Sequence, residues 1–160
     1  MNRSQTRTVL ATIAMFCFAL LAYVFYLQHG PEKQQPCPLC ILQRYAYFLL
    51  GVAALVSAIW LNRATTLAAT LAAVSGGGLA MWQVLKGADM TSCQRDPIGI
   101  FVNQLPMADW WPEFLFATGG CADKYTTFGL PVPVLSLAGF IGLAGVIVFV
   151  FIRSKEPPTA

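Results

Sequence analysis

The chain has 160 residues, of which 57% are hydrophobic and only 11% are charged, and its formal net charge is +3 at pH 7. A soluble domain usually carries about 25% charged residues, so this composition excludes a protein that faces water on all sides. The length is that of about one domain. We therefore expect a lipid bilayer, and no nucleic acid, as the surroundings of this chain.

Four apolar runs predict four membrane-spanning helices. Each run holds about 20 residues, which at about 1.5 Å rise per residue cross a hydrocarbon core about 30 Å thick. Only the second run contains a formal charge, Arg44. The sequence thus predicts an all-α membrane protein, a four-transmembrane-helix bundle in a single domain. The runs cover about residues 8–27, 41–61, 64–85 and 134–152.

The first run resembles a signal peptide in one respect, because Arg3 and Arg7 precede it. The apolar region of a signal peptide is normally about 7–15 residues and leads to a small-residue cleavage site. This run is longer, and its end carries the bulky residues Tyr23, Phe25 and Tyr26. We therefore expect it to be retained as a helix.

The basic residues predict the orientation of the bundle. The two terminal tails and the turn between the second and third runs are short segments, in which the positive-inside rule has most force. Both termini are therefore expected in the cytoplasm. The loops of about 28–40 and 86–133 are then periplasmic. The basic residues of the short segments are Arg3, Arg7, Arg63, Arg153 and Lys155.

Four of the five cysteines fall on the predicted outer side. Cys37 and Cys40 lie in the first outer loop, and Cys93 and Cys121 lie in the second. Disulfides persist outside the plasma membrane, whereas cytosolic thiols stay reduced, so an even set on one face indicates disulfide chemistry. The fifth, Cys17, lies among apolar residues of the first run, where a thiol is usually inert.

The candidate redox chemistry lies in residues 36–44, Pro-Cys-Pro-Leu-Cys-Ile-Leu-Gln-Arg. The spacing of Cys37 and Cys40 lets the two sulfurs meet where a helix begins. The free N–H groups and dipole there stabilise a thiolate, the attacking species in disulfide exchange. Arg44 follows Cys40 by one turn. Its guanidinium favours a Cys40 thiolate and can donate hydrogen bonds to a quinone carbonyl. The alternative interpretation of Arg44 is an anchor at the membrane interface.

Other interpretations of the cysteine pair fit less well. A c-type haem site needs His directly after the second cysteine, where Ile41 stands. A four-cysteine zinc site is usually built from two close pairs, whereas Cys93 and Cys121 are far apart, so no metal is expected. A thioredoxin-like fold needs a βαβ unit, which the helical pattern lacks. A purely structural disulfide framework stays open.

The second outer loop is long for a connection, which indicates a function. Residues 110–116 predict a short amphipathic helix at the membrane interface, with Asp109 as its cap and Pro112 in its first turn. This helix would hold Cys121 near the membrane surface and near Cys37. Cys93 lies in a polar stretch that a soluble partner could reach.

These features together resemble the disulfide bond formation protein B family (DsbB), and the resemblance covers nearly the whole chain. Cys-Pro-Leu-Cys is followed by Gln43 and Arg44 at the start of the second span, and one cysteine lies at each end of the long loop. The loop stretches Trp-Pro-Glu at 111–113 and Gly-Gly-Cys-Ala at 119–122 also resemble this family.

The resemblance implies a protein-dithiol:quinone oxidoreductase of the bacterial inner membrane, which sustains periplasmic disulfide formation. A Cys93–Cys121 disulfide would oxidise a reduced DsbA-like thioredoxin-fold partner, with Cys93 forming the mixed disulfide. Electrons would pass to Cys37 and Cys40, for which a transient Cys37–Cys121 bond is one route. Cys40 would meet ubiquinone or menaquinone from the membrane pool, and Arg44 would help to bind it.

One departure sets a limit on the resemblance. The segment before Cys93 is short and has no His, where some family members carry a His implicated at the quinone; His29 is expected to be only interfacial. A vitamin K epoxide reductase-like protein would place its Cys-x-x-Cys in a late span, the reverse of the order here. A structural membrane subunit braced by disulfides is the alternative outside enzymology.

Overall fold

The computed structural model describes residues 2–30, 35–86, 97–119, 126–127 and 129–153. Within these residues, four long apolar helices have the length and composition to cross a membrane. They are α1 (Arg3–His29), α2 (Pro38–Trp60), α3 (Arg63–Lys86) and α7 (Val132–Arg153). The predicted all-α class with four candidate spans is confirmed. Cys93 and Cys121 lie outside the described residues.

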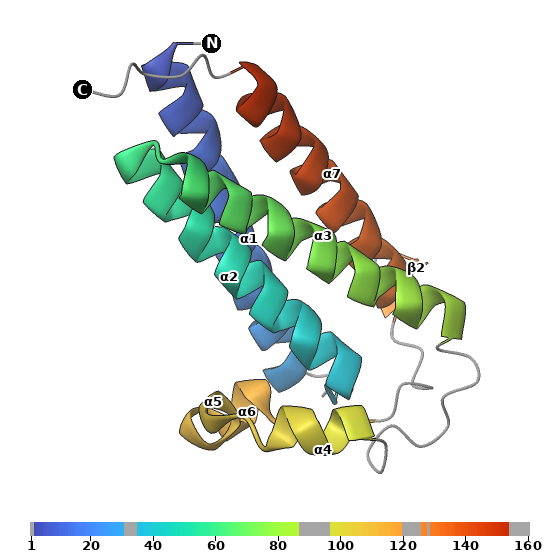
Figure 1. Ribbon diagram of the computed structural model, residues 1–160. Helices are drawn as coiled ribbons and strands as arrows, with labels where there is room; N and C mark the ends of the chain where they lie inside the picture. Colours follow the sequence, from blue (N-terminus) through green and yellow to red (C-terminus); the bar gives the residue numbers. More distant parts are fainter. Residues whose placement is uncertain (1, 31–34, 87–96, 120–125, 128, 154–160) are drawn as a thin grey trace.

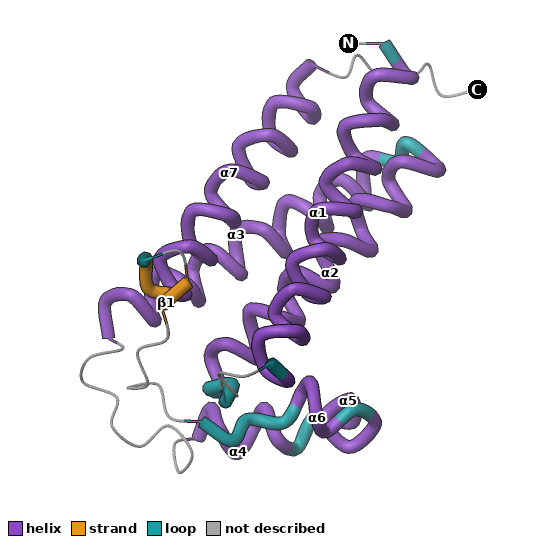
Figure 2. The backbone as a smooth tube through the Cα atoms, turned by 180° about the vertical axis from the view of Figure 1, so that it is seen from behind, coloured by secondary structure: helices purple, strands orange, loops and turns teal. Residues whose placement is uncertain are grey.

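The four long helices form an open bundle (Figure 1). Helix α2 packs along α1 and α3, and α3 packs along α7, whereas α1 and α7 touch each other little. The start of α1, the end of α7 and the α2–α3 turn lie at one end of the bundle, and the start of α2 lies at the other. The same arrangement is seen from behind in Figure 2.

Capping interactions set both ends of α2. At its start, Cys37 has an extended backbone and its sulfur accepts a hydrogen bond from the Cys40 N–H, with Pro38 as the first helical residue. The helix therefore begins earlier than the apolar run at 41–61. At its other end, Leu61 adopts a left-handed conformation with a φ of 46°. The Asn62 side chain then accepts the Ala64 N–H, which opens α3.

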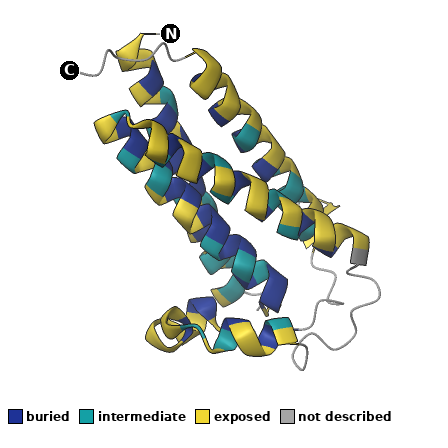
Figure 3. Ribbon diagram, in the orientation of Figure 1, coloured by how far each residue is buried: buried dark blue, intermediate teal, exposed yellow. Residues whose placement is uncertain are grey.

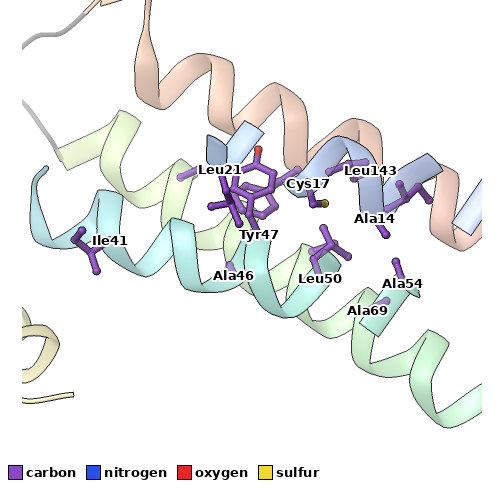
Figure 4. Close-up of a cluster of buried hydrophobic side chains, with 14 of the residues drawn as sticks. Ala14, Cys17, Leu21, Ile41, Ala46, Tyr47, Leu50, Ala54, Ala69 and Leu143 are labelled. Carbon is purple, nitrogen blue, oxygen red and sulfur yellow. The ribbon is translucent and has the colours of Figure 1, made fainter. Parts of the chain in front are cut away.

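Buried side chains line the inner faces of the helices, while the outer faces expose large apolar residues suited to lipid (Figure 3). The buried cluster in Figure 4 includes Cys17, Tyr47 and Leu143. The Tyr47 ring stacks on Phe140 with ring centroids 4.0 Å apart. Phe140 in turn lies directly against Gly76 of α3, so a glycine allows α3 and α7 to approach.

The second outer loop contains three short helices that lie across the end of the bundle where α2 begins (Figure 1). They are α4 (Pro97–Asn103), α5 (Pro106–Trp110) and α6 (Pro112–Leu115). Two short strands, β1 (Thr126–Thr127) and β2 (Leu130–Pro131), pair antiparallel before α7. Gly129 turns between them with a φ of 78°.

The predicted cap of the amphipathic segment is wrong. Asp109 lies inside α5, and the residue before α6 is Trp111, which makes no side-chain capping bond. The reason is that Pro106 and Pro112 each open a separate short helix, so Asp109 belongs to the earlier one. Pro112 does stand in the first turn, as predicted.

Gly76→Ala is expected to lower the free energy of unfolding by about 1–3 kcal/mol, the usual cost of overpacking a core. The added Cβ would lie 2.3 Å from the Phe140 ring, which is fully buried and has no space to move. Gly78→Ala is the matched control, because nothing lies within 4 Å of its Cβ position. Thermal unfolding in detergent checks this, and equal midpoints for the two variants would contradict the packing argument.

Candidate functional site

The two cysteines of the first outer loop lie together at the start of α2. Cys37 caps the helix and is 3% exposed, and Cys40 is the third helical residue and half-buried. The Cys40 N–H lies 3.2 Å from the Cys37 sulfur. Both are free thiols here. The start of a helix thus brings the pair into contact and directs backbone N–H groups toward sulfur.

A glutamine from another span also contacts the pair. Gln83 of α3 places its amide nitrogen 3.3 Å from the Cys37 sulfur and 3.4 Å from the Cys40 sulfur. Its oxygen accepts a 2.7 Å hydrogen bond from the Gln43 amide. Gln83 was not among the residues predicted from the sequence. A buried amide inside an apolar run is a signal that could have made it a candidate, but not one that predicts its contact with sulfur.

Arg44 points into the protein and is only 7% exposed. Its Nη1 donates to Gln28 Oε1 at 2.8 Å and to the Phe114 carbonyl oxygen, and its guanidinium lies 4.7 Å from the centre of the Phe114 ring. Its Nε is buried without a hydrogen-bond partner among the described residues. A buried donor of this kind is available to a ligand.

These contacts fasten α6 over the start of α2. Besides Arg44, Gln28 of α1 reaches α6, where its amide donates to the Glu113 carbonyl. Phe25 packs against Phe114 at 5.7 Å between ring centroids. His29 lies at the end of α1 with its Nε2 3.8 Å from a Glu113 carboxylate oxygen, outside the cavity described below. Helix α6 is therefore held by polar and aromatic contacts to α1 and α2.

The loop is also tied to the residue that precedes Cys37. The backbone N–H groups of Thr118 and Gly119 donate to the Pro36 carbonyl at 3.2 and 3.0 Å. Gly119 is required at this point, because a Cβ there would lie 2.5 Å from the Gln35 backbone oxygen. Residue 119 is two positions before Cys121 in the sequence. The described stretch 97–119 of the loop thus ends next to the residues that precede Cys37.

A cavity of about 320 Å³ opens beside this pair, between α1, α2 and α7. Cys37, Cys40 and Arg44 line it, and most of its remaining wall is apolar. On the α7 side, the hydroxyl oxygens of Thr127 and Ser136 are buried without a hydrogen-bond partner among the described residues. An apolar pocket with a few convergent polar groups is the usual form of a small-molecule site.

The electrostatics of the pair are asymmetric. The hydrogen bond with Cys40, and then burial, raise the pKa of the Cys37 thiol. The negative charge of a singly ionised pair therefore lies on Cys40. The positive charge of Arg44 acts more strongly on Cys40 than on Cys37, which agrees with their one-turn separation on α2.

Of the residues selected from the sequence, the structure brings together Cys37, Cys40 and Arg44. Cys93 and Cys121 lie outside the described residues, so their placement stays a prediction. Gln28 and the Phe114 carbonyl, which both accept hydrogen bonds from Arg44, were not predicted from the sequence. A backbone carbonyl gives no signal in a sequence, because every residue has one.

Membrane-length helices that hold a Cys-x-x-Cys pair at a helix start define a multi-pass membrane protein suited to thiol chemistry. The family model described as "Disulfide bond formation protein DsbB" matches residues 6–150. The chain therefore belongs to the DsbB family, oxidoreductases with a role in disulfide bond formation.

Individual relatives agree with this membership. The chain is similar to disulfide bond formation protein B of Herminiimonas arsenicoxydans, with 36% identity over 95% of this chain and 99% of the relative. The protein of the same name from Ralstonia nicotianae is 37% identical over 96% of this chain and 99% of its own length. That of Nitrosomonas europaea is 35% identical, with 86% and 88% covered.

We expect the three described thiols to react with a small alkylating reagent in the order Cys40, Cys37, Cys17. Reaction requires an accessible thiolate. Cys40 is the most exposed of the three, Cys37 has a raised pKa, and Cys17 is fully buried. Mass spectrometry of the reduced protein would measure each rate, with Cys17 slower than Cys40 by about tenfold or more.

The Cys40→Ser variant provides the control. It removes the partner that raises the pKa of Cys37, so Cys37 should ionise more readily and react faster, while Cys17 is unchanged. Equal Cys37 rates with and without Cys40 would contradict the asymmetry of the pair.

Proposed function

We propose that this chain is a protein-dithiol:quinone oxidoreductase that reoxidises a periplasmic DsbA-like partner and passes the electrons to membrane quinone. One observation carries the proposal. A single apolar cavity is lined by a thiol at a helix start, Cys40, and by a buried arginine, Arg44, whose Nε has no partner among the described residues. Thiol oxidation and the binding of a small electron acceptor can therefore take place side by side.

The described residues fit a quinone head group. The cavity of about 320 Å³ is at the small end of typical ligand sites, about 300–1,000 Å³. Arg44 would donate to one carbonyl oxygen, and the Ser136 and Thr127 hydroxyls are further buried donors in the same cavity. A bound quinone supplies the capacity to accept two electrons and two protons.

The protein residues would carry the electrons in two thiol–disulfide exchanges. In the first, the Cys93–Cys121 disulfide takes two electrons from the partner dithiol. The partner becomes a disulfide, and Cys93 and Cys121 become thiols. In the second, these thiols reduce the Cys37–Cys40 disulfide and are themselves reoxidised. The hydrogen bonds from residues 118 and 119 to Pro36 support a route through Cys37 and Cys121.

The distribution of charge supports an inner-membrane orientation with the cysteines outside. Arg3, Arg63 and Arg153 belong to the end of the bundle that holds the start of α1, the end of α7 and the α2–α3 turn. The Cys37–Cys40 pair and α4–α6 lie at the opposite end. With the basic end in the cytoplasm, the redox pair faces the periplasm.

A purely structural disulfide is the competing proposal, and the geometry of the pair disfavours it. A disulfide brace stabilises mainly by closing a long loop. Cys37 and Cys40 belong to one helix start, so their bond would close almost no loop. A pair in this position is better suited to exchange than to bracing.

Turnover of the purified protein tests the proposed function. With reduced partner and a soluble quinone, quinone absorbance should fall, and Cys40→Ser should abolish the change. Arg44→Lys should raise the KM for quinone by about tenfold, because an ammonium cannot replace a planar guanidinium. Cys17→Ser is the matched control and should keep full activity, since Cys17 lies in the core. Undiminished turnover in Cys40→Ser would exclude this mechanism.

Gly119→Ala is expected to lower kcat by about tenfold or more, because small displacements of reacting groups cost large factors in rate. The new Cβ would collide with the Gln35 backbone and release the hydrogen bonds to Pro36. Gly78→Ala, which adds the same methyl group in open space, should turn over normally. An unaltered kcat for Gly119→Ala would show that the anchored loop does not contribute to electron transfer.

A further inference from the structure

Two glutamines from neighbouring spans form a chain of hydrogen bonds that ends on the cysteine pair. Gln43 and Gln83 are each only 5% exposed. Gln43 belongs to α2, one turn after Cys40, and Gln83 reaches the pair from α3. Buried amides in membrane helices are costly unless every polar group is used. The position of the Gln83 amide against two sulfurs therefore calls for a functional explanation.

In the structure, the nitrogen of the Gln83 amide faces the sulfurs and its oxygen faces Gln43. Gln43 donates to Gln83 Oε1 at 2.7 Å, so the Gln83 nitrogen is turned away from Gln43. That nitrogen lies 3.3 Å from the Cys37 sulfur and 3.4 Å from the Cys40 sulfur. An amide nitrogen has two hydrogens to donate, one for each sulfur. The amide oxygen, which would repel a thiolate, is occupied elsewhere.

The surroundings strengthen these bonds. Leu39, Leu79 and Ile98 pack around the pair, and Ile98 comes from α4. In apolar surroundings a hydrogen bond to a charged group is stronger than in water. A donor stabilises a sulfur anion more than a neutral disulfide sulfur, so these bonds favour the reduced pair.

We propose that Gln83, oriented by Gln43, is a positioning residue that sets the reduction potential of the Cys37–Cys40 couple. By stabilising the reduced pair, the Gln83 amide raises this potential and makes the Cys37–Cys40 disulfide a better acceptor of electrons from the outer cysteines. The inference rests on the proposed function, in which these two residues form a redox couple. It adds a residue outside the Cys-x-x-Cys helix that tunes that couple.

The test is an equilibrium titration with glutathione in detergent, without quinone. The full chain carries Cys93→Ser and Cys121→Ser, so that only the inner pair exchanges. In the reaction, the disulfide and two reduced glutathiones give two protein thiols and one oxidised glutathione, which balances atoms and electrons. Gln83→Met, which has a similar length but no donor, should lower the equilibrium constant about tenfold, a shift of about 30 mV for two electrons.

Two further variants separate tuning from general damage to the fold. Gln43→Met leaves the Gln83 amide unoriented and should shift the equilibrium in the same direction by a smaller factor. Gln104→Met makes the same chemical change on an exposed loop residue and should leave the constant unchanged. If Gln83→Met does not fold, Gln83→Asn, which shortens the reach of the amide, should give an intermediate shift.

The outcomes distinguish this inference from the proposed function. If the parent chain forms no Cys37–Cys40 disulfide at any glutathione ratio, the proposed function itself fails. If the disulfide forms, and folded Gln83 variants titrate like the parent and like Gln104→Met, the proposed function stands and the role of Gln83 is overturned.

Discussion

The buried charge of Arg44 is the constraint on which the arrangement of the outer end depends. A charge inside a membrane helix must be compensated by hydrogen bonds. Among the described residues, its hydrogen-bond acceptors are the neutral oxygens of Gln28 and Phe114. These oxygens come from α1 and α6. The hydrogen bonds of one guanidinium therefore hold an outer-loop helix against the membrane bundle. The position of α6 over the start of α2 is a consequence of this requirement.

These neutral acceptors take hydrogen bonds from Nη1 of Arg44 and do not cancel its charge. A positive centre that lacks a carboxylate partner among the described residues favours a nearby anion. The raised pKa of Cys37 leaves the charge of the ionised pair on Cys40, on which Arg44 acts most strongly. The same cation would stabilise negative charge developing on a ligand in the cavity. In the proposed function, one residue would thus act both on the sulfur and on the ligand.

The sequence was sufficient to predict the features that depend on residues close to one another along the chain. The four spans follow from runs of apolar residues, and the proximity of Cys37, Cys40 and Arg44 follows from their position within eight residues at one helix start. The prediction failed for Asp109 because two prolines divide the loop into separate helices. An element that anchors the loop was correctly predicted within residues 110–116. The contacts that hold this element were not predicted.

Features that depend on two helices meeting were beyond the sequence. Gln83 lies more than forty positions from the cysteines, and only the packing of α3 on α2 brings its amide to the sulfurs. The Phe114 carbonyl is still more remote, 70 positions from Arg44. Spacing along a chain predicts neighbours on one helix, whereas neighbours on different helices depend on packing angles. The roles assigned to Cys93 and Cys121 stay predictions.

The outer end combines two kinds of attachment that differ in how easily they release. Arg44 and the aromatic residues hold α6 through buried contacts, which are costly to break. Residues 118 and 119 are held to Pro36 by backbone hydrogen bonds, each of which contributes only about 0.5–1.5 kcal/mol. The attachment of residues 118 and 119 to Pro36 is therefore weaker than the attachment of α6 to the start of α2.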